Sequence, residues 1–172
     1  VVKSASRRAI WLGVNLGTAF LAAAVVDQFQ TTIDKIVLLA VLMPVVPSMG
    51  GVAGSQSLTI ITRAMALGQI DRGNARRILT KELMVGVLNG VAWAVVVAAA
   101  TYLWFGDWRI GGVIGAAMII NLFIAALAGF SIPLTLKRLG IDPALAGGVV
   151  LTTVTDVIGY AAFLGLAAAL LL

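Results

Sequence analysis

Five long stretches of apolar residues, separated by short polar segments, make up most of the chain. Four stretches carry no charged residue, and they cover residues 9–26, 36–62, 83–106 and 110–136. The fifth, residues 143–172, carries one acidic residue, Asp156. A helix that spans a bilayer needs about 20 apolar residues, whereas membrane β-strands alternate apolar and polar residues over about 10 positions. Residues 91–100 (VAWAVVVAAA) show no alternation. The pattern predicts an all-α integral membrane protein with five transmembrane helices, at approximately 9–27, 36–62, 83–106, 110–136 and 144–172.

The composition agrees with this prediction and excludes several other classes of protein. Of the 172 residues, 61% are hydrophobic and 11% are charged, whereas a soluble domain has about 25% charged residues. The chain is too hydrophobic to be disordered. It contains no Cys and no His, so thiol catalysis, disulfides, cysteine zinc sites and histidine bases are excluded. We therefore expect no enzyme activity.

The basic residues predict the orientation of the helices. Ten of the twelve Lys and Arg flank the spans on one side, and they are Lys3, Arg7, Arg8, Arg63, Arg72, Arg76, Arg77, Lys81, Lys137 and Arg138. Lys35 and Arg109 lie on the other side. The positive-inside rule then places the N-terminus in the cytoplasm and the C-terminus outside, in a multi-pass protein of the cell's inner (plasma) membrane. We assign these charges to topology and to anionic lipid headgroups, and expect no nucleic-acid partner.

The chain begins at Val1 and not at Met. The first apolar stretch has a basic flank, as a signal peptide does, but it is long and lacks a clear small-residue cleavage site. We expect a retained helix, and a fragment of a larger protein with a cytoplasmic domain upstream. The 172 residues are interpreted as one transmembrane pore domain.

The second stretch contains helix-breaking residues. Pro44 and Pro47 are followed by three glycines and by the polar sequence Ser55-Gln56-Ser57. One interpretation is a tight helix–helix contact through the GxxxG pair of Gly50 and Gly54. The other is a polar, wet path, since freed backbone groups at membrane depth persist only when buried in protein or lining a cavity. We favour the second, and the candidate pore-lining residues are Gly51, Gly54, Gln56 and Ser57.

Asp156 lies near the middle of the fifth stretch. A carboxylate at the bilayer centre costs about 2.5–3.5 kcal/mol even on insertion scales. Its helical neighbours, Thr152 among them, are small or hydroxylated, and those that we add as candidate pore-lining residues are Thr153, Thr155 and Gly159. Asp156 could be a neutral acid hydrogen-bonded to another helix. We favour the other reading, an ion or proton site, because no basic residue lies within a span.

The available ligands favour a hydrated divalent cation. Only oxygen ligands occur within the spans, which suits a hard cation. One Asp per chain is too few for a dehydrated Ca²⁺, whereas Mg²⁺ keeps several waters and uses one or two carboxylates. Two Asp156 carboxylates facing each other in a symmetric dimer would repel, and a divalent cation would match both charges. Several hydrated divalent metal ions meet these requirements.

Three segments resemble the transmembrane domain of the MgtE family of magnesium channels. They are residues 7–12 (RRAIWL), 50–70 (GGVAGSQSLTIITRAMALGQI) and 152–167 (TTVTDVIGYAAFLGLA). The resemblance implies a homodimer in which the second and fifth helices line one central ion path. It implies that Asp156 binds a hydrated Mg²⁺ and that the backbone carbonyl of Thr152 faces the ion's waters. It also implies cytoplasmic magnesium-sensing and CBS domains, which are absent from this chain. Val52 departs from the pattern, because the family has Asn there.

Two other functions stay open from the sequence. One is a proton- or sodium-coupled cation carrier that uses Asp156 as its coupling site. The other is a non-transporting membrane subunit in which Asp156 pairs with a basic residue of a partner.

Overall fold

The computed structural model describes residues 2–71 and 73–172, in which α-helices joined by short turns are the regular secondary structure. The helices are α1 (Val2–Asp27), α2 (Gln30–Lys35), α3 (Leu38–Leu42), α4 (Val45–Ala66), α5 (Ala75–Phe105), α6 (Trp108–Arg138) and α7 (Pro143–Leu171). Five segments are long and apolar enough to cross a membrane, with α3 and α4 together forming the second. The predicted all-α fold with five spans is confirmed. Arg72 and the side chains of Lys3, Arg7 and Arg8, which entered the orientation prediction, lie outside the described residues.

The helix ends differ from the edges of the uncharged runs. Helix α5 begins at Ala75 rather than near residue 83, so Lys81 and Glu82 are helical. Lys and Glu are both good helix formers. The two charges therefore mark the edge of the apolar run at residue 83 but not the start of helix α5. The second span is interrupted at Met43–Pro44, between α3 and α4. Proline has no N–H to donate and disfavours a continuous helix, which explains the position of the break.

Aspartates in the short turns on either side of α6 cap the N-termini of α6 and α7. The Asp107 carboxylate accepts hydrogen bonds from the backbone N–H groups of Arg109 (2.8 Å) and Ile110 (3.4 Å). Asp142 accepts from the N–H of Ala144 at 2.9 Å, at the start of α7. Such caps satisfy donors that a helix N-terminus otherwise leaves unpaired.

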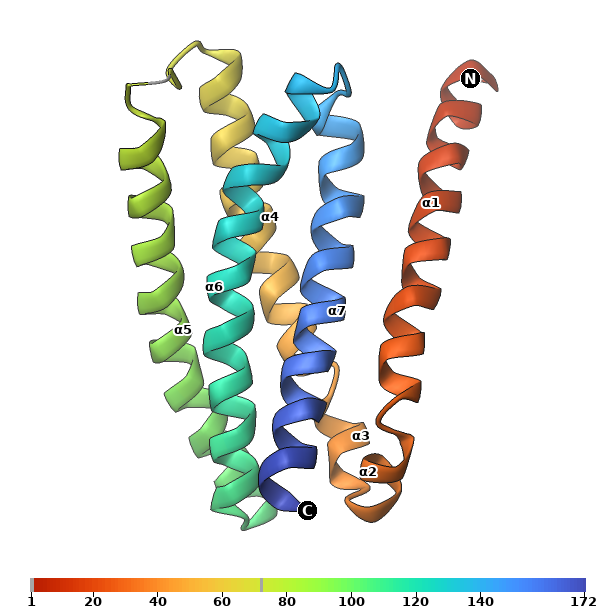
Figure 1. The fold of residues 1–172 in the computed structure, drawn as a ribbon, viewed down its shortest axis with the longest axis vertical. Helices are drawn as coiled ribbons and strands as arrows, with labels where there is room; N and C mark the ends of the chain where they lie inside the picture. Colours follow the sequence, from red (N-terminus) through yellow and green to blue (C-terminus); the bar gives the residue numbers. More distant parts are fainter. Residues whose placement is uncertain (1, 72) are drawn as a thin grey trace.

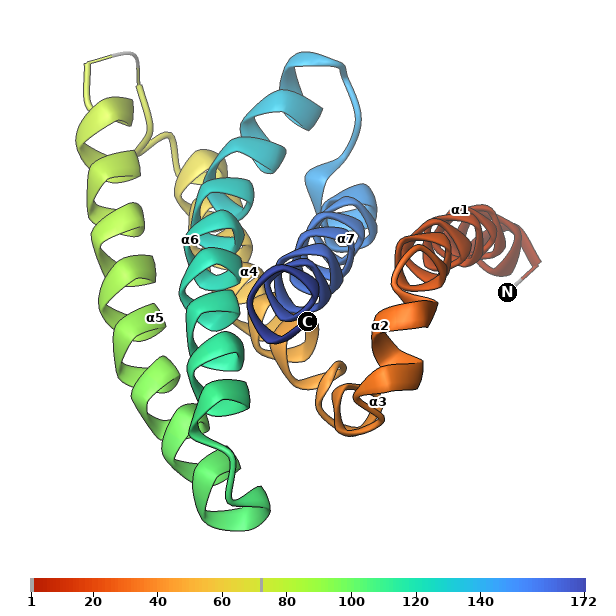
Figure 2. The ribbon, with the colours of Figure 1, turned by 60° about the horizontal axis from the view of Figure 1, so that its bottom comes forward.

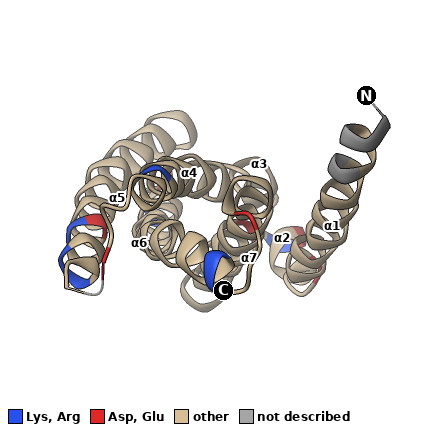
Figure 3. Cartoon of the chain, turned by 90° about the horizontal axis from the view of Figure 1, so that it is seen from above, with Lys and Arg blue, Asp and Glu red and all other residues tan. Residues whose placement is uncertain are grey.

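The long helices run up and down between two ends of the bundle (Figure 1). One end holds the α4–α5 and α6–α7 turns and the start of α1, and we call it the basic end. Figure 3 looks onto the basic end. Its described Lys and Arg side chains belong to Arg63, Arg76, Arg77, Lys81, Lys137 and Arg138. The opposite end holds α2, the α5–α6 turn and the C-terminus.

Helix α6 forms the centre of the bundle and packs against α5, α4 and α7. Small residues allow this close approach, which is a common basis of helix packing in membranes. A Cβ on Gly111 of α6 would lie 2.8 Å from the carbonyl oxygen of Ala98 on α5, and one on Gly86 of α5 would lie 2.7 Å from the Cβ of Ala126. Helix α1 stands at the edge beside α7 (Figure 2) and is largely exposed, with Phe20 69% accessible.

Candidate functional site

Asp156 lies on the side of α7 that faces α1. The side chain is half-buried and lines a groove of about 330 Å³ together with Tyr160, one helical turn further on. The other residues of this groove are apolar, and they are Ala19, Ala22, Ala23, Val26 and Met43. Within the described part of the chain, Asp156 is therefore the charged residue of this groove. A single acid in such surroundings can hold a proton or a cation, or can meet a group from another chain.

The three threonines beside Asp156 all direct their hydroxyl protons back to α7. Thr152 Oγ1 donates to the carbonyl of Gly148 at 3.0 Å, and Thr153 Oγ1 donates to that of Val149 at 2.7 Å. Thr155 Oγ1 lies 3.2 Å from the carbonyls of both Leu151 and Thr152. Since each hydroxyl has one proton, the oxygens are left as acceptors. Acceptors of this kind suit the waters around a cation.

Two of the predicted site residues lie on the flank of α7 next to Asp156, where the helix packs against α4 and α6. Thr155 is fully buried, and a Cβ on Gly51 of α4 would lie 3.8 Å from its Oγ1. Gly159 is buried against α4, where an added Cβ would lie 2.9 Å from Cγ of Pro47. We call residues 44–54, with their two prolines and three glycines, the Pro-Gly segment. The structure thus brings this segment against α7, within one turn of Asp156.

Gly50 and Gly54 form close helix–helix contacts. A Cβ on Gly54 would lie 2.7 Å from Cδ1 of Leu151 on α7, and a Cβ on Gly50 would collide with the side chain of Asn121 on α6. The carbonyl oxygen of Gly54 also lies 2.8 Å from the position of a Cβ on Gly129. Within one chain, Gly50 and Gly54 therefore pack as the first of the two interpretations expects, as a tight helix–helix contact.

Gln56 and Ser57 line a different cavity from Asp156. This cavity, of about 240 Å³, lies between α4 and α5. Ser57 Oγ donates a 2.6 Å hydrogen bond to Oε2 of Glu82 on α5. Glu82 is a buried acid that the sequence analysis missed, because it precedes the uncharged run at residue 83. Its spacing from Gly86 and Asn89, four and seven residues further on, was the available signal, since such positions share one helix face.

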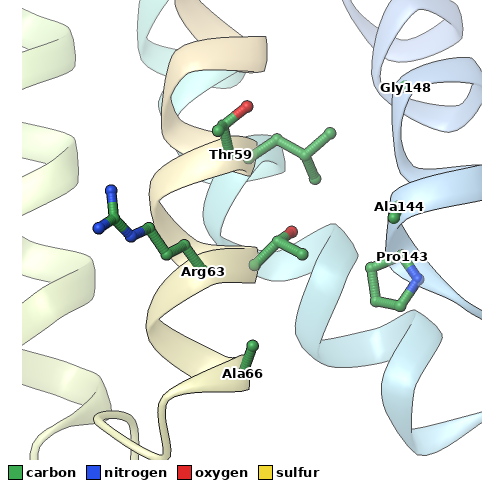
Figure 4. A pocket seen from close by; sticks show the side chains of 8 residues that line it. Thr59, Arg63, Ala66, Pro143, Ala144 and Gly148 are labelled. Carbon is green, nitrogen blue, oxygen red and sulfur yellow. The ribbon is translucent and has the colours of Figure 1, made fainter.

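A wider opening lies between α4 and α7 at the basic end. It has a volume of about 480 Å³, and its lining includes Thr59, Thr62 and Ala66 of α4 and Pro143 and Ala144 of α7. Arg63 of α4 also lines this opening, and Figure 4 shows that its side chain extends away from Pro143. The gap between α4 and α7 therefore opens at this end beside hydroxyl groups, apolar groups and the side chain of Arg63.

The fold and the isolated acid define a multi-pass membrane protein with an architecture suited to ion transport. A model of the MgtE family, described as a divalent cation transporter, matches residues 43–166, which include α4 to most of α7. The chain belongs to the MgtE family. The resemblance inferred from the sequence is confirmed, and the family is one of transporters and not of enzymes.

Curated relatives match over almost the whole chain. The magnesium transporter MgtE of Thermus thermophilus is 33% identical over 164 residues, which is 95% of this chain and 36% of that protein. The magnesium transporter MgtE of Bacillus subtilis is 28% identical over 166 residues, 96% of this chain and 37% of that protein. That of Enterococcus faecalis is 30% identical over 155 residues, 90% and 34%. The chain spans about a third of the length of these relatives.

Proposed function

We propose that this chain forms the membrane pore of a magnesium transporter, and that two copies conduct a hydrated Mg²⁺ past Asp156. Membership of the MgtE family is the observation that carries this proposal. The names of the relatives support Mg²⁺ as the ion. The matched residues include Asp156 and the segment of α4 that packs against its helix.

The surroundings of Asp156 suit an ion that keeps its water. One carboxylate per chain cannot replace a hydration shell, but it can accept hydrogen bonds from the waters of Mg²⁺. The oxygens of Thr152 and Thr153 are acceptors because their protons are already used. Two such faces across a dimer axis would present two carboxylates to one divalent ion, so that the charges balance.

Helix α4 contributes an outward face of hydroxyl groups to the proposed path. Ser48, Ser55 and Thr59 are exposed at helical spacing, and this stripe leads to the 480 Å³ opening at the basic end. Val52, which is 57% exposed, lies on the same stripe. Hydroxyl groups that face lipid find no further hydrogen-bond partner there, whereas hydroxyl groups that face a second copy across a wet path hydrogen-bond to water.

We place the basic end in the cytoplasm by the positive-inside rule. A cytoplasmic regulatory region belongs to the same proposal, and the greater length of the relatives supports it.

Flux measurements on reconstituted protein test the proposal. Purified chain in liposomes that enclose a fluorescent Mg²⁺ indicator should admit Mg²⁺, and Asp156→Ala should lower the rate at least tenfold. Asp27→Asn removes an exposed carboxylate at the C-terminal end of α1 that does not line the groove of Asp156, and it serves as the control. Equal flux through native protein and Asp156→Ala would reject Asp156 as the pore residue. Flux that stops when the proton or sodium gradient is removed would show a coupled carrier instead.

A further inference from the structure

Glu82 is a second acidic side chain that is buried in the bundle. It lies on α5 toward the basic end and is 8% exposed. Its Oε2 accepts the hydrogen bond from Ser57, which is also 8% exposed. Within the described part of the chain, no hydrogen bond to Oε1 and no ion pair to Glu82 is found. A buried carboxylate that lacks a cationic partner is costly.

The same carboxylate lines the 240 Å³ cavity between α4 and α5. Leu122 and Ala126 of α6 line it as well. Two exposed residues, Gln56 on α4 and Asn89 on α5, add a carboxamide each. The cavity therefore combines one carboxylate, one hydroxyl and two carboxamides, which are oxygen ligands or hydrogen-bond partners for the waters of a hard cation.

The size of the cavity suits a cation that keeps its first hydration shell. Six waters at about 30 Å³ each occupy roughly 180 Å³, and Mg²⁺ in proteins commonly binds through one or two carboxylates and its own waters. Lys81 also lines the cavity, but its side chain is exposed. Long basic side chains near a helix end extend toward the interface, so its ammonium group is expected at the rim of the cavity.

We propose that the cavity between α4 and α5 is a binding site for a small hydrated divalent cation, with Glu82 as the anionic ligand and Gln56, Ser57 and Asn89 around the ion's waters. This α4–α5 site is separate from Asp156, which lines the groove between α7 and α1. It holds one ion per chain, because all its ligands come from one copy.

An ion in the α4–α5 site would link α4 to α5. Gln56 and Ser57 follow Gly54 directly on α4, so the ion would hold the Pro-Gly segment of α4 in one position against α7. This regulatory consequence rests on the proposed function, whereas the binding itself does not. Occupancy would favour the conformation of α4 seen here, in the sense that a ligand favours the state to which it binds better.

Equilibrium dialysis of the purified chain in lipid nanodiscs against Mg²⁺ tests the site. The native protein should bind one ion per chain at the α4–α5 site and one further ion per two chains at Asp156. Glu82→Gln keeps the shape and the Ser57 contact, and it should remove one ion per chain. Asp156→Asn should remove only the one ion shared by two chains, and Asp27→Asn should leave the number of bound ions unchanged. Unchanged stoichiometry in Glu82→Gln would overturn the site.

Two more variants separate a bound cation from other occupants of the cavity. Lys81→Met removes a positive charge at the rim and should lower the Kd of Mg²⁺ about threefold at low salt; weaker binding would show that Lys81 was a structural partner of Glu82 and would reject the proposal. Ser57→Ala leaves the carboxylate in place but removes one of the groups around the ion's waters, so it should raise the Kd of Mg²⁺ severalfold and still bind one ion per chain. This variant keeps the site testable if Glu82→Gln fails to fold, and an unchanged Kd would overturn the ligand set.

Infrared difference spectra distinguish a metal ion from a proton. A carboxylic-acid band that disappears in Glu82→Gln and persists in native protein at saturating Mg²⁺ would show a proton on Glu82 and overturn the proposal. Loss of Mg²⁺ binding in Glu82→Gln with flux retained would leave the proposed function intact. Intact binding at Glu82 with flux unaffected by Asp156→Ala would reject the proposed function alone.

Discussion

Asn121 of α6 donates a hydrogen bond from Nδ2 to the backbone carbonyl of Val46 on α4, across 2.8 Å. Both residues have no exposed surface. The contact lies beside Pro47, and glycines on two helices make room for it, because a Cβ on Gly50 would collide with Asn121 and one on Gly159 would lie 3.0 Å from Nδ2. A polar side chain of α6 thus holds the Pro-Gly segment of α4 at the height where α7 packs.

Replacing Asn121 by Ala should destabilise the fold. The variant loses a buried hydrogen bond, worth about 1 kcal/mol, and leaves a small cavity. The loss is moderated because Oδ1 of Asn121 has no hydrogen-bond partner among the described residues, and its desolvation cost disappears with it. We expect a decrease of about 1–2 kcal/mol in the free energy of unfolding, measured by SDS titration in mixed micelles. Unchanged stability would show that the contact is energetically neutral.

Gly50→Ala should be harmful alone and tolerated together with Asn121→Ala. The single variant forces a methyl group into the Asn121 side chain, and overpacking of this kind costs about 1–3 kcal/mol. Removing the Asn121 side chain makes the space. The double-mutant cycle should therefore show a favourable coupling of at least about 1 kcal/mol, as contacting residues do. Additive effects would mean that α4 and α6 shift apart instead.

Two glycines of α6 give a matched pair for the packing of α4. A Cβ on Gly129 would lie 2.6 Å from Cβ of Ser57 and 2.8 Å from the carbonyl oxygen of Gly54, whereas nothing lies within 4 Å of one on Gly112. Gly129→Ala should lower the melting temperature, because backbone cannot give way cheaply. Gly112→Ala should keep or raise it, since Ala is favoured over Gly in a helix by about 0.5–1 kcal/mol. Similar melting temperatures for the two variants would contradict the packing described.

Gly51 is the better position than Gly54 for testing the ion path. A methyl group on Gly51 makes only an ordinary contact, 3.8 Å from Thr155 Oγ1, whereas one on Gly54 meets Leu151 at 2.7 Å. Gly51→Ala should fold and conduct normally. Gly51→Leu should lower Mg²⁺ flux severalfold in liposomes if α4 and α7 line the path, with unchanged insertion as the control. Native flux in Gly51→Leu would place the path elsewhere.

The five spans could be predicted because each is a long apolar run, and a bilayer imposes that requirement on every crossing helix. Asp156 was found for the same reason, as a charge inside such a run. Glu82 was missed because a charged residue at the end of a run reads as a boundary. The role of Asn121 could not be predicted, since it depends on a glycine from α4 and a glycine from α7 that only the tertiary fold brings to it. The sequence likewise does not say which helix each face of α7 contacts, since the positions of α1 and α4 beside it are set by the tertiary fold.

Single cysteines test the orientation of the bundle, and the chain is suited to this because it contains no Cys. Gln69 is exposed in the α4–α5 turn at the basic end, and Trp108 is exposed at the start of α6 at the opposite end. The excess of Lys and Arg at the basic end predicts that it stays in the cytoplasm. A membrane-impermeant maleimide added to cells whose outer membrane or cell wall has been removed should therefore label Trp108→Cys without permeabilisation. It should label Gln69→Cys only after the membrane is permeabilised. The reverse pattern would invert the orientation, and it would place the 480 Å³ opening between α4 and α7 on the outer face of the membrane.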